Sequence, residues 1–199
     1  MQKPAITDKD IHPLIKNRWS PRSFDVRSVE TVKLQRLFEA ARWAPSSFNE
    51  QPWRFVAGIK GDETWQKIFD SLNEWNQQWA AEAPVLVLTI GSTRHAKNNK
   101  ENAIFKYDVG QAVACLTVQA SADGLVVHQM GGFSKQKAVE HFDIPEDFVP
   151  LTVSAIGYQA APEKLPADFE TLERNPRSRK PLEEFVFSGR FGQPSTLAS

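Results

Sequence analysis

The chain has 199 residues, a length that suits one domain with a full hydrophobic core, with or without an extension. Its 24 basic residues balance its 24 acidic ones, whereas a general nucleic-acid-binding protein usually carries a basic excess, so no nucleic-acid partner is expected. The single cysteine, Cys115, excludes a disulfide within the chain and a cysteine-based zinc site, and it favours a reducing, cytoplasmic location. The longest apolar run, residues 84–90, is far shorter than the roughly 20 residues that cross a bilayer, so no membrane partner is expected.

The first predicted elements are two helices separated by a polar loop. A short helix is expected over residues 10–16, and the loop follows over residues 18–27. The clearest helix covers residues 29–44, because its apolar side chains fall mostly on one face. Ser28 is the expected cap of this helix, and Pro45 is expected to stop it.

Two strands and one helix are predicted next. A loop over residues 46–52 leads to a strand over residues 54–59. A single helix, capped by Asp62, is expected to run as far as Trp79, because apolar side chains recur at helical spacing. The continuous apolar run over residues 85–90 has the length of a strand and predicts burial on both faces.

The pattern of helices and strands continues through the third quarter of the chain. Residues 93–102 are polar and predict a loop, and residues 104–122 predict a long helix. Further strands are expected over residues 125–129 and 151–158, with a short helix over residues 134–141 between them. These elements predict an α/β or α+β sandwich in which helices cover a small sheet. No strand is followed by the Gly-x-Gly-x-x-Gly motif, so a Rossmann domain is not expected, and neither is a metal site.

The last 40 residues differ in character. Residues 160–181 are rich in proline and charge and show no periodicity. The apolar residues 185–187 stand alone, and a lone strand of this kind needs a sheet edge, either its own or that of a partner chain. We therefore expect a core over residues 1–160 and a C-terminal extension over residues 161–199 within the same domain.

Four polar segments could carry chemistry. In an extended segment Arg18, Ser20 and Arg22 would present two guanidinium groups and a hydroxyl to one side, which suits a phosphate or a planar group with several acceptors. Taken alone, the segment could equally be a solvated loop. The hydroxyl and amide groups of residues 44–53 could bind a polar heterocycle or simply end a helix in a turn.

The other two polar segments lie further along the chain. The glycine pair that follows Met130 allows the backbone to approach a ligand closely, or allows a tight turn. An isolated basic cluster could close over a phosphate or form a solvated patch; it consists of Arg174, Arg177, Arg179 and Lys180. The local sequence does not decide between a ligand-binding role and a purely structural role for either segment.

Taken together, these segments resemble the nitroreductase family of flavoproteins. The resemblance rests on Arg-x-Ser-x-Arg at residues 18–22, Pro-Ser-Ser-x-Asn-x-Gln-Pro-Trp at residues 45–53, Gly-Gly-Phe at residues 131–133 and the basic segment at residues 177–180. It covers nearly the whole chain, and the segment at residues 45–53 is its most specific part. It implies an α+β three-layer sandwich with a mainly antiparallel central sheet flanked by helices. It further implies a homodimer with FMN at the subunit interface, in which each C-terminal strand is exchanged with the partner.

The resemblance also implies roles for individual residues. Arg18 and Ser20 would contact the phosphate and ribityl end of FMN, and Arg22 would lie near the pyrimidine edge and tune the flavin. Arg177 and Arg179 would return from the tail to the phosphate. Two further groups would line the flavin: Pro45, Ser46, Ser47 and Asn49 from the other subunit, and Met130, Gly131 and Gly132 through their backbone. Trp19 departs from the basic or polar residue common at its position, and Asn76 is the candidate for an asparagine that meets the flavin.

The implied activity is hydride transfer from NADH or NADPH to a small oxidised acceptor such as a nitroaromatic compound or a quinone, by a ping-pong mechanism. No side chain is needed as a nucleophile, because the cofactor supplies the redox chemistry. The alternatives are a dehalogenase, an enoate reductase or a flavin-consuming enzyme of the same family, a non-catalytic FMN-binding protein, and a phosphate-binding module without flavin. The short polar loop at residues 93–103 favours a general reductase. Neither the physiological acceptor nor the role of His128 follows from the sequence.

Overall fold

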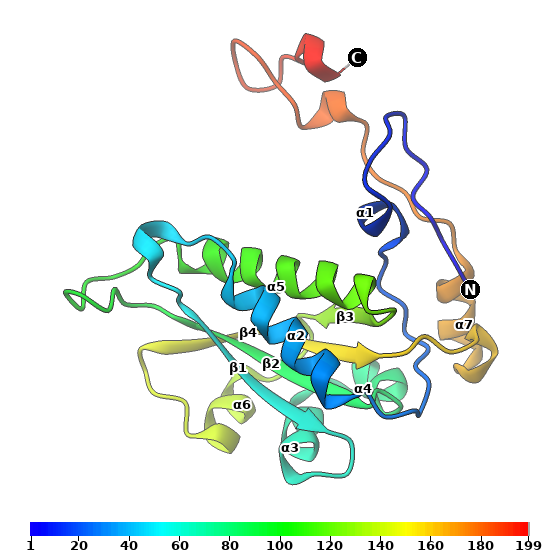
Figure 1. The fold of residues 1–199 in the computed structure, drawn as a ribbon, viewed down its shortest axis with the longest axis vertical. Coiled ribbons are helices and arrows are strands. Elements are labelled where there is room, and N and C mark those ends of the chain that lie inside the picture. Colours follow the sequence, from blue (N-terminus) through cyan, green and yellow to red (C-terminus); the bar gives the residue numbers. More distant parts are fainter. Residues whose placement is uncertain (199) are drawn as a thin grey trace.

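The computed structural model describes residues 1–198 and contains one antiparallel sheet with helices on both of its faces (Figure 1). The strands lie in the order β1-β2-β4-β3. Their bounds are β1 (Trp53–Ile59), β2 (Val85–Ser92), β3 (Val126–Met130) and β4 (Phe148–Gly157). Every pairing between neighbouring strands is antiparallel. The predicted α+β sandwich with a mainly antiparallel sheet is therefore confirmed.

The described residues contain seven α-helices, five of which cover the faces of this sheet (Figure 1). They are α1 (Pro13–Asn17), α2 (Thr31–Arg42), α3 (Glu63–Ser71), α4 (Glu74–Ala80), α5 (Phe105–Ala122), α6 (Lys135–Phe142) and α7 (Ala167–Arg174). Figure 1 shows α2 and α5 over one face of the sheet and α3, α4 and α6 over the other. The sheet is therefore the middle layer of three.

The central strand β2 explains why the molecule has two cores. Its side chains alternate between them, with Val85 and Val87 packing under α2 and α5, and Leu86, Leu88 and Ile90 packing against α3, α4 and α6. Successive residues of a strand point to opposite faces, so a continuous apolar run serves both layers. The prediction of a strand buried on both faces is confirmed.

Two predictions about the first helices are wrong in detail. The short helix begins at Pro13 rather than at residue 10, because proline suits the first helical position and the His12 ring accepts a hydrogen bond from the Leu14 amide. The α2 helix begins at Thr31, and its N-cap is Glu30 without a side-chain hydrogen bond, so Ser28 does not cap it. It ends at Arg42, ahead of Pro45, as expected.

The single helix predicted from residue 62 to residue 79 is two helices. Asp62 caps α3 as predicted, because its carboxylate accepts a hydrogen bond of 2.6 Å from the Trp65 amide. The helix stops where Asn73 caps α4 by accepting from the Asn76 amide, and the Asn73 amide itself donates to the Gly132 carbonyl. Asparagine side chains compete with helical hydrogen bonds in this way, and here a contact distant in sequence favours the break.

The tail contains a helix that the sequence did not predict, and its apolar residues 185–187 do not join the sheet of their own chain. Residues 167–174 form α7, whose Phe169 and Glu173 are buried. Residues 185–187 do not pair with the sheet of their own chain. Among the described residues, the β-bridge that Phe187 makes is to Pro194, within the tail itself. Figure 1 shows this orange-to-red segment extending away from the sheet and its helices.

Candidate functional site

Three of the predicted basic residues come together from opposite ends of the chain. The Arg18 guanidinium donates to Ser20 Oγ at 3.3 Å, so these two side chains face the same side, as their spacing predicted. Burial lowers the pKa of Arg18, and the positive charges of Arg177 and Arg179 lower it further. Arg18, Arg177 and Arg179 therefore form one cationic cluster, called the arginine cluster below.

The two tail arginines of the cluster make different contacts. Arg177 Nη1 donates to the carbonyl oxygens of Lys3 at 2.6 Å and Lys16 at 3.0 Å, so it connects the tail to the N-terminal segment. Arg179 is exposed, and its Nη1 donates to the neighbouring carbonyl of Ser178. Arg179 thus keeps most of its donors toward solvent, whereas Arg177 is partly used within the chain.

Trp19 and Arg22 flank the cluster. The ammonium group of Lys3 lies 4.7 Å from the centre of the Trp19 ring, a cation–π contact that accounts for an aromatic residue at this position. Arg22 lies near β3, since its positive charge lowers the pKa of His128. It also lowers the pKa of Lys3, so Arg22 adds to the positive field of the arginine cluster.

His128 holds the backbone between Ser20 and Arg22. Its Nδ1 lies 3.1 Å from the Pro21 carbonyl oxygen, and its ring packs against Trp79 with 4.4 Å between centroids. Burial, and after it the charge of Arg22, lower the pKa of His128 to about 4. The ring is therefore neutral near pH 7, and Nδ1–H donates to Pro21.

Glu173 is the functional residue that the sequence did not reveal. Its carboxylate lies on α7 with no exposed surface and accepts hydrogen bonds from the amides of Arg22 and Ser23. The sequence of the tail shows no clear periodicity, but Phe169 lies one helical turn before Glu173, and in a helix that spacing puts both residues on one face. Glu173 therefore orients the backbone of Arg22, from which the Arg22 side chain projects.

A second group lies at the end of β3. The Gly132 carbonyl accepts hydrogen bonds from Asn76 Nδ2 at 3.0 Å and from the Asn73 amide at 3.1 Å. A Cβ atom added to Gly132 would lie 2.5 Å from Asn73 Nδ2 and 2.8 Å from Asn76 Nδ2, so a larger residue there would displace these two side chains, whereas at Gly131 it would meet nothing within 4 Å. The turn and the start of α4 line an open cavity of 810 Å³. Met130, which precedes the turn, is buried.

The third group follows α2 and has a strained backbone. Phe48, Asn49 and Gln51 have φ values of 52°, 56° and 49°, in the left-handed region that L residues seldom adopt. Ser46 Oγ accepts from the Gln51 amide, and the Ser47 amide donates to the buried carboxylate of Asp108. Strain of this kind persists where the surroundings enforce it, and it is concentrated at functional sites.

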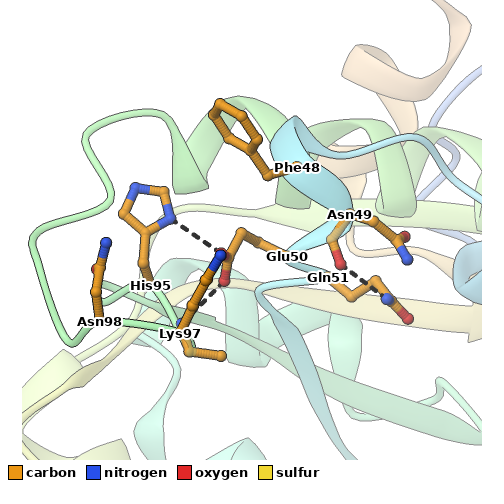
Figure 2. Close-up of a pocket in the computed structure, with 8 residues that line it drawn as sticks. Phe48, Asn49, Glu50, Gln51, His95, Lys97 and Asn98 are labelled. Atoms are coloured by element: carbon orange, nitrogen blue, oxygen red, sulfur yellow. Dashed lines mark hydrogen bonds and ion pairs between the residues drawn. The ribbon is translucent and has the colours of Figure 1, made fainter.

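A cavity separates this strained segment from the loop after β2. Glu50 bridges the two, because one carboxylate oxygen accepts from the Ala96 amide at 2.9 Å and the other lies 3.2 Å from His95 Nδ1. The hydrogen bond from Ala96, and after it the contact with His95, keep the pKa of Glu50 low. Figure 2 shows Glu50 pointing toward His95, whereas Asn49 and Gln51 point the other way. The cavity has a volume of 830 Å³.

The structure brings some predicted site residues together and keeps others apart. Arg18, Trp19, Ser20 and Arg22 share one region with the tail arginines, and Asn76 meets the Gly131–Gly132 turn. The strained segment with Pro45, Ser46, Ser47 and Asn49 lies at the far end of α2, and Figure 1 shows its cyan ribbon well separated from the blue ribbon of residues 18–22. Across residues 1–198 no helix is long and apolar enough to cross a bilayer, and no cluster of side chains is arranged to hold a metal ion.

Comparison with known proteins identifies the family. The model of the nitroreductase family matches residues 15–76. A protein of Mycolicibacterium smegmatis described as an uncharacterised 15.4 kDa protein is 31% identical over 151 residues, which cover 71% of this chain and 99% of that protein. An FMN reductase [NAD(P)H] of Bacillus subtilis is 27% identical over 158 residues, 71% of this chain and 62% of that enzyme.

Among solved structures, an oxidoreductase containing FMN superposes with a TM-score of 0.89 at 38% sequence identity. The match covers 94% of this chain and 96% of that one, so it extends over the sheet, the helices on both faces and most of the tail. The family model matches the N-terminal part of the chain, and the chain covers almost the full length of two relatives that are more than 30% identical to it. The chain therefore belongs to the nitroreductase family.

Proposed function

We propose that the protein is an FMN-dependent oxidoreductase that takes hydride from NADH or NADPH and passes it to a small oxidised acceptor such as a nitroaromatic compound or a quinone. The arginine cluster is the observation that carries this proposal, because it gathers cations from both ends of the chain beside a hydroxyl donor. The names of two relatives support it, since one is an oxidoreductase containing FMN and the other an FMN reductase that uses NAD(P)H.

The chemistry of the cluster fits the phosphate of FMN. After burial, the charges of Arg177 and Arg179 lower the pKa of Arg18, and the charge of Arg179 lowers the pKa of Arg177, so the positive charges of the cluster repel. A phosphate group would relieve this repulsion and accept hydrogen bonds from the guanidinium groups and from Ser20. The open position at Gly131 would let the backbone approach the flavin ring, with Asn76 beside it. Trp19 would support the cluster through its contact with Lys3.

We further propose that the working form is a homodimer. Several large apolar side chains are strongly exposed in the single chain, including Trp43 at 74%, Phe48 at 92% and Phe191 at 93%. A second copy that covers these side chains would remove their apolar surface from water, which favours association. The partner would also bring its Pro45, Ser46, Ser47 and Asn49 to the site, and its tail would add a strand through residues 185–187.

In this site the chain binds and orients, and the cofactor reacts. FMN held there would supply the hydride-transfer chemistry between the nicotinamide and the acceptor. Arg18, Ser20 and Arg179 would hold the phosphate end, and Arg22 would offset the negative charge that reduction adds at the pyrimidine edge. A donor and an acceptor that use the same face of the flavin in turn would give ping-pong kinetics, which we expect here.

An absorbance spectrum of the purified protein, followed by anaerobic titration with NADH and with NADPH, tests the proposal. We expect a flavin spectrum that bleaches with at least one nicotinamide and returns on addition of a quinone or a nitroarene. A protein that stays colourless with added FMN would instead be a phosphate-binding module. A flavin-bound protein that does not turn over would be a binding or sensing protein, and either result contradicts the proposal.

The role of Arg22 gives a separate prediction. Arg22→Ala should lower the midpoint potential of the bound flavin and slow its reduction, because a positive charge near the reduced ring is lost. Arg27→Ala is the matched control, since Arg27 stacks on the Tyr158 ring at 3.3 Å, five residues along the chain from Arg22. A potential that is equal in the wild type and Arg22→Ala would remove this role.

A further inference from the structure

We propose that Glu173 is a positioning residue, whose buried carboxylate holds the backbone at residues 22–23 so that the Arg18 and Arg22 side chains face the anionic cofactor. This inference rests on the proposed function, but its first step, the fixing of that backbone, can be tested without flavin. Residues 18–23 are called the basic segment below.

The hydrogen bonds of Glu173 are directed at the backbone of the basic segment. Both carboxylate oxygens lie 3.0 Å from the Arg22 amide nitrogen, and Oε1 also lies 3.3 Å from the Ser23 amide nitrogen. The side chain is fully buried. A buried carboxylate is costly unless hydrogen bonds satisfy it, so this arrangement is strongly favoured over one in which the segment moves away.

Other contacts hold the same turn from different sides. Ser23 Oγ donates to the Ala161 carbonyl at 2.6 Å, and the Ala160 amide donates to the Ser23 carbonyl at 3.0 Å. On the opposite side His128 donates to the Pro21 carbonyl. Proline has no amide hydrogen, so position 21 cannot contribute a donor of its own. The amide of Arg22, the next residue, does donate, and Glu173 is its acceptor.

The charge of Glu173 also suits its place. The surrounding cations are Lys3, Arg18, Arg22, Arg177 and Arg179. At Lys3 the charge of Glu173 raises the pKa, against the lowering by burial and by Arg177 and Arg22. A carboxylate paired with the guanidinium groups themselves would compete with a phosphate. Because the carboxylate of Glu173 binds backbone amides instead, it leaves the Arg18 and Arg22 guanidinium groups available.

A role in packing alone would predict a different result from a role in positioning. If the Glu173 side chain only filled space beside the basic segment, an apolar side chain of similar size would preserve both stability and FMN affinity. If it positions the basic segment, a glutamine that keeps one acceptor oxygen should preserve part of the effect, and leucine should preserve none. The matched control is Glu170→Gln, one turn earlier on the same helix, where the half-buried carboxylate pairs with Arg174.

The experiment compares wild type, E173Q, E173L and E170Q in two measurements. Amide hydrogen exchange in the flavin-free protein should be faster at Arg22 and Ser23 in E173L, intermediate in E173Q and unchanged in E170Q. The dissociation constant of FMN, measured by flavin fluorescence, should rise by about tenfold or more in E173L and less in E173Q. Riboflavin, which lacks the phosphate, should lose less affinity than FMN.

Each result decides one part of the inference. Unchanged exchange at Arg22 and Ser23 in a folded E173L, or in E173Q if E173L does not fold, would overturn it. FMN affinity within twofold of wild type, together with faster exchange, would also overturn it, because the segment would then move without consequence for the ligand. Failure of the wild type to bind FMN would refute the proposed function, while the exchange data would still test whether Glu173 fixes the backbone.

Discussion

The imidazole ring of His128 lies between the Pro21 carbonyl and the indole ring of Trp79, where burial and the charge of Arg22 lower its pKa to about 4. The ordinary pKa of histidine, 6.5, applies to the unfolded chain. Between these two values the unfolded chain binds a proton that the folded chain does not. Acid therefore stabilises the unfolded state over this range, and the contribution of neutral His128 is complete only above pH 6.5.

This linkage predicts a pH dependence of stability. On acidification from pH 6.5 to pH 4, His128 should remove up to about 3 kcal/mol from the free energy of unfolding. His128→Gln should be less stable at pH 7 but should lose less on acidification. Urea unfolding at a series of pH values measures this, with His12→Gln at an exposed position as the control. Equal slopes in wild type and His128→Gln would show that His128 does not titrate in this way.

Single residues also show how far the sequence could lead. The alternation of Arg18, Ser20 and Arg22 was enough to predict that the first two side chains meet, because the geometry of an extended segment is local. The partner of their backbone could not be predicted, since Glu173 lies 151 residues from Arg22 along the chain. The sequence alone gives no sign that a charged residue in a polar tail is buried; the fold has to be known.

At the scale of elements, helix starts depend on whether a side chain reaches a free amide. Asp62 accepts from the Trp65 amide at 2.6 Å and also from the Ile59 amide at 2.8 Å. Ser28 is a favoured capping residue but lies too far before α2, whose N-cap is Glu30. Sequence alone ranks both residues as good caps, and the difference lies in where each helix begins.

These two positions make a matched pair of variants. Asp62→Ala should lower the free energy of unfolding by about 1–2 kcal/mol, because two amides lose their acceptor. Ser28→Ala should change it by less than about 0.5 kcal/mol. Urea unfolding at pH 7 measures both changes. A loss at Ser28→Ala as large as that at Asp62→Ala would contradict the observed start of α2.

The elements that the sequence predicted best are those governed by continuous local patterns. β2 and α5 follow from an apolar run and from helical periodicity, which fix the type of element regardless of its partners. The division between α3 and α4 was missed because Asn73 is bonded to Gly132, far along the chain. The helix α7 was missed because prolines and charges concealed two buried positions in the tail.

At the scale of the whole molecule, the terminal segment beyond residue 181 has little contact with the sheet of its own chain (Figure 1). Its exposed apolar side chains, Phe185, Phe191 and Leu197, would be costly in a monomer. We propose that residues 161–199 act as an extension that covers the partner, while residues 1–160 form the core. No pattern within one chain specifies which surface of a partner such a tail covers.

Deletion of residues 182–199 tests this arrangement. The truncated protein should dissociate into monomers at concentrations where the full chain is dimeric, and it should lose bound flavin, because contacts with the partner disappear. Sedimentation velocity measures the mass, and absorbance measures the flavin. Phe191→Ser should weaken the dimer by roughly tenfold, as expected for loss of a buried aromatic contact, with Arg190→Ser as its control. A truncated chain that stays dimeric would exclude this role for the tail.

The distance between the basic segment and the strained segment after α2 has a genetic consequence. If each cofactor lies between the basic segment of one subunit and the strained segment of the other, both subunits contribute residues to every site. A chain damaged at Arg18 and a chain damaged at Ser46 would each be inactive in pure form. A mixture of the two chains would form heterodimers in which one site carries both substitutions and the other site carries neither. Two inactive alleles would therefore restore activity when they are expressed together.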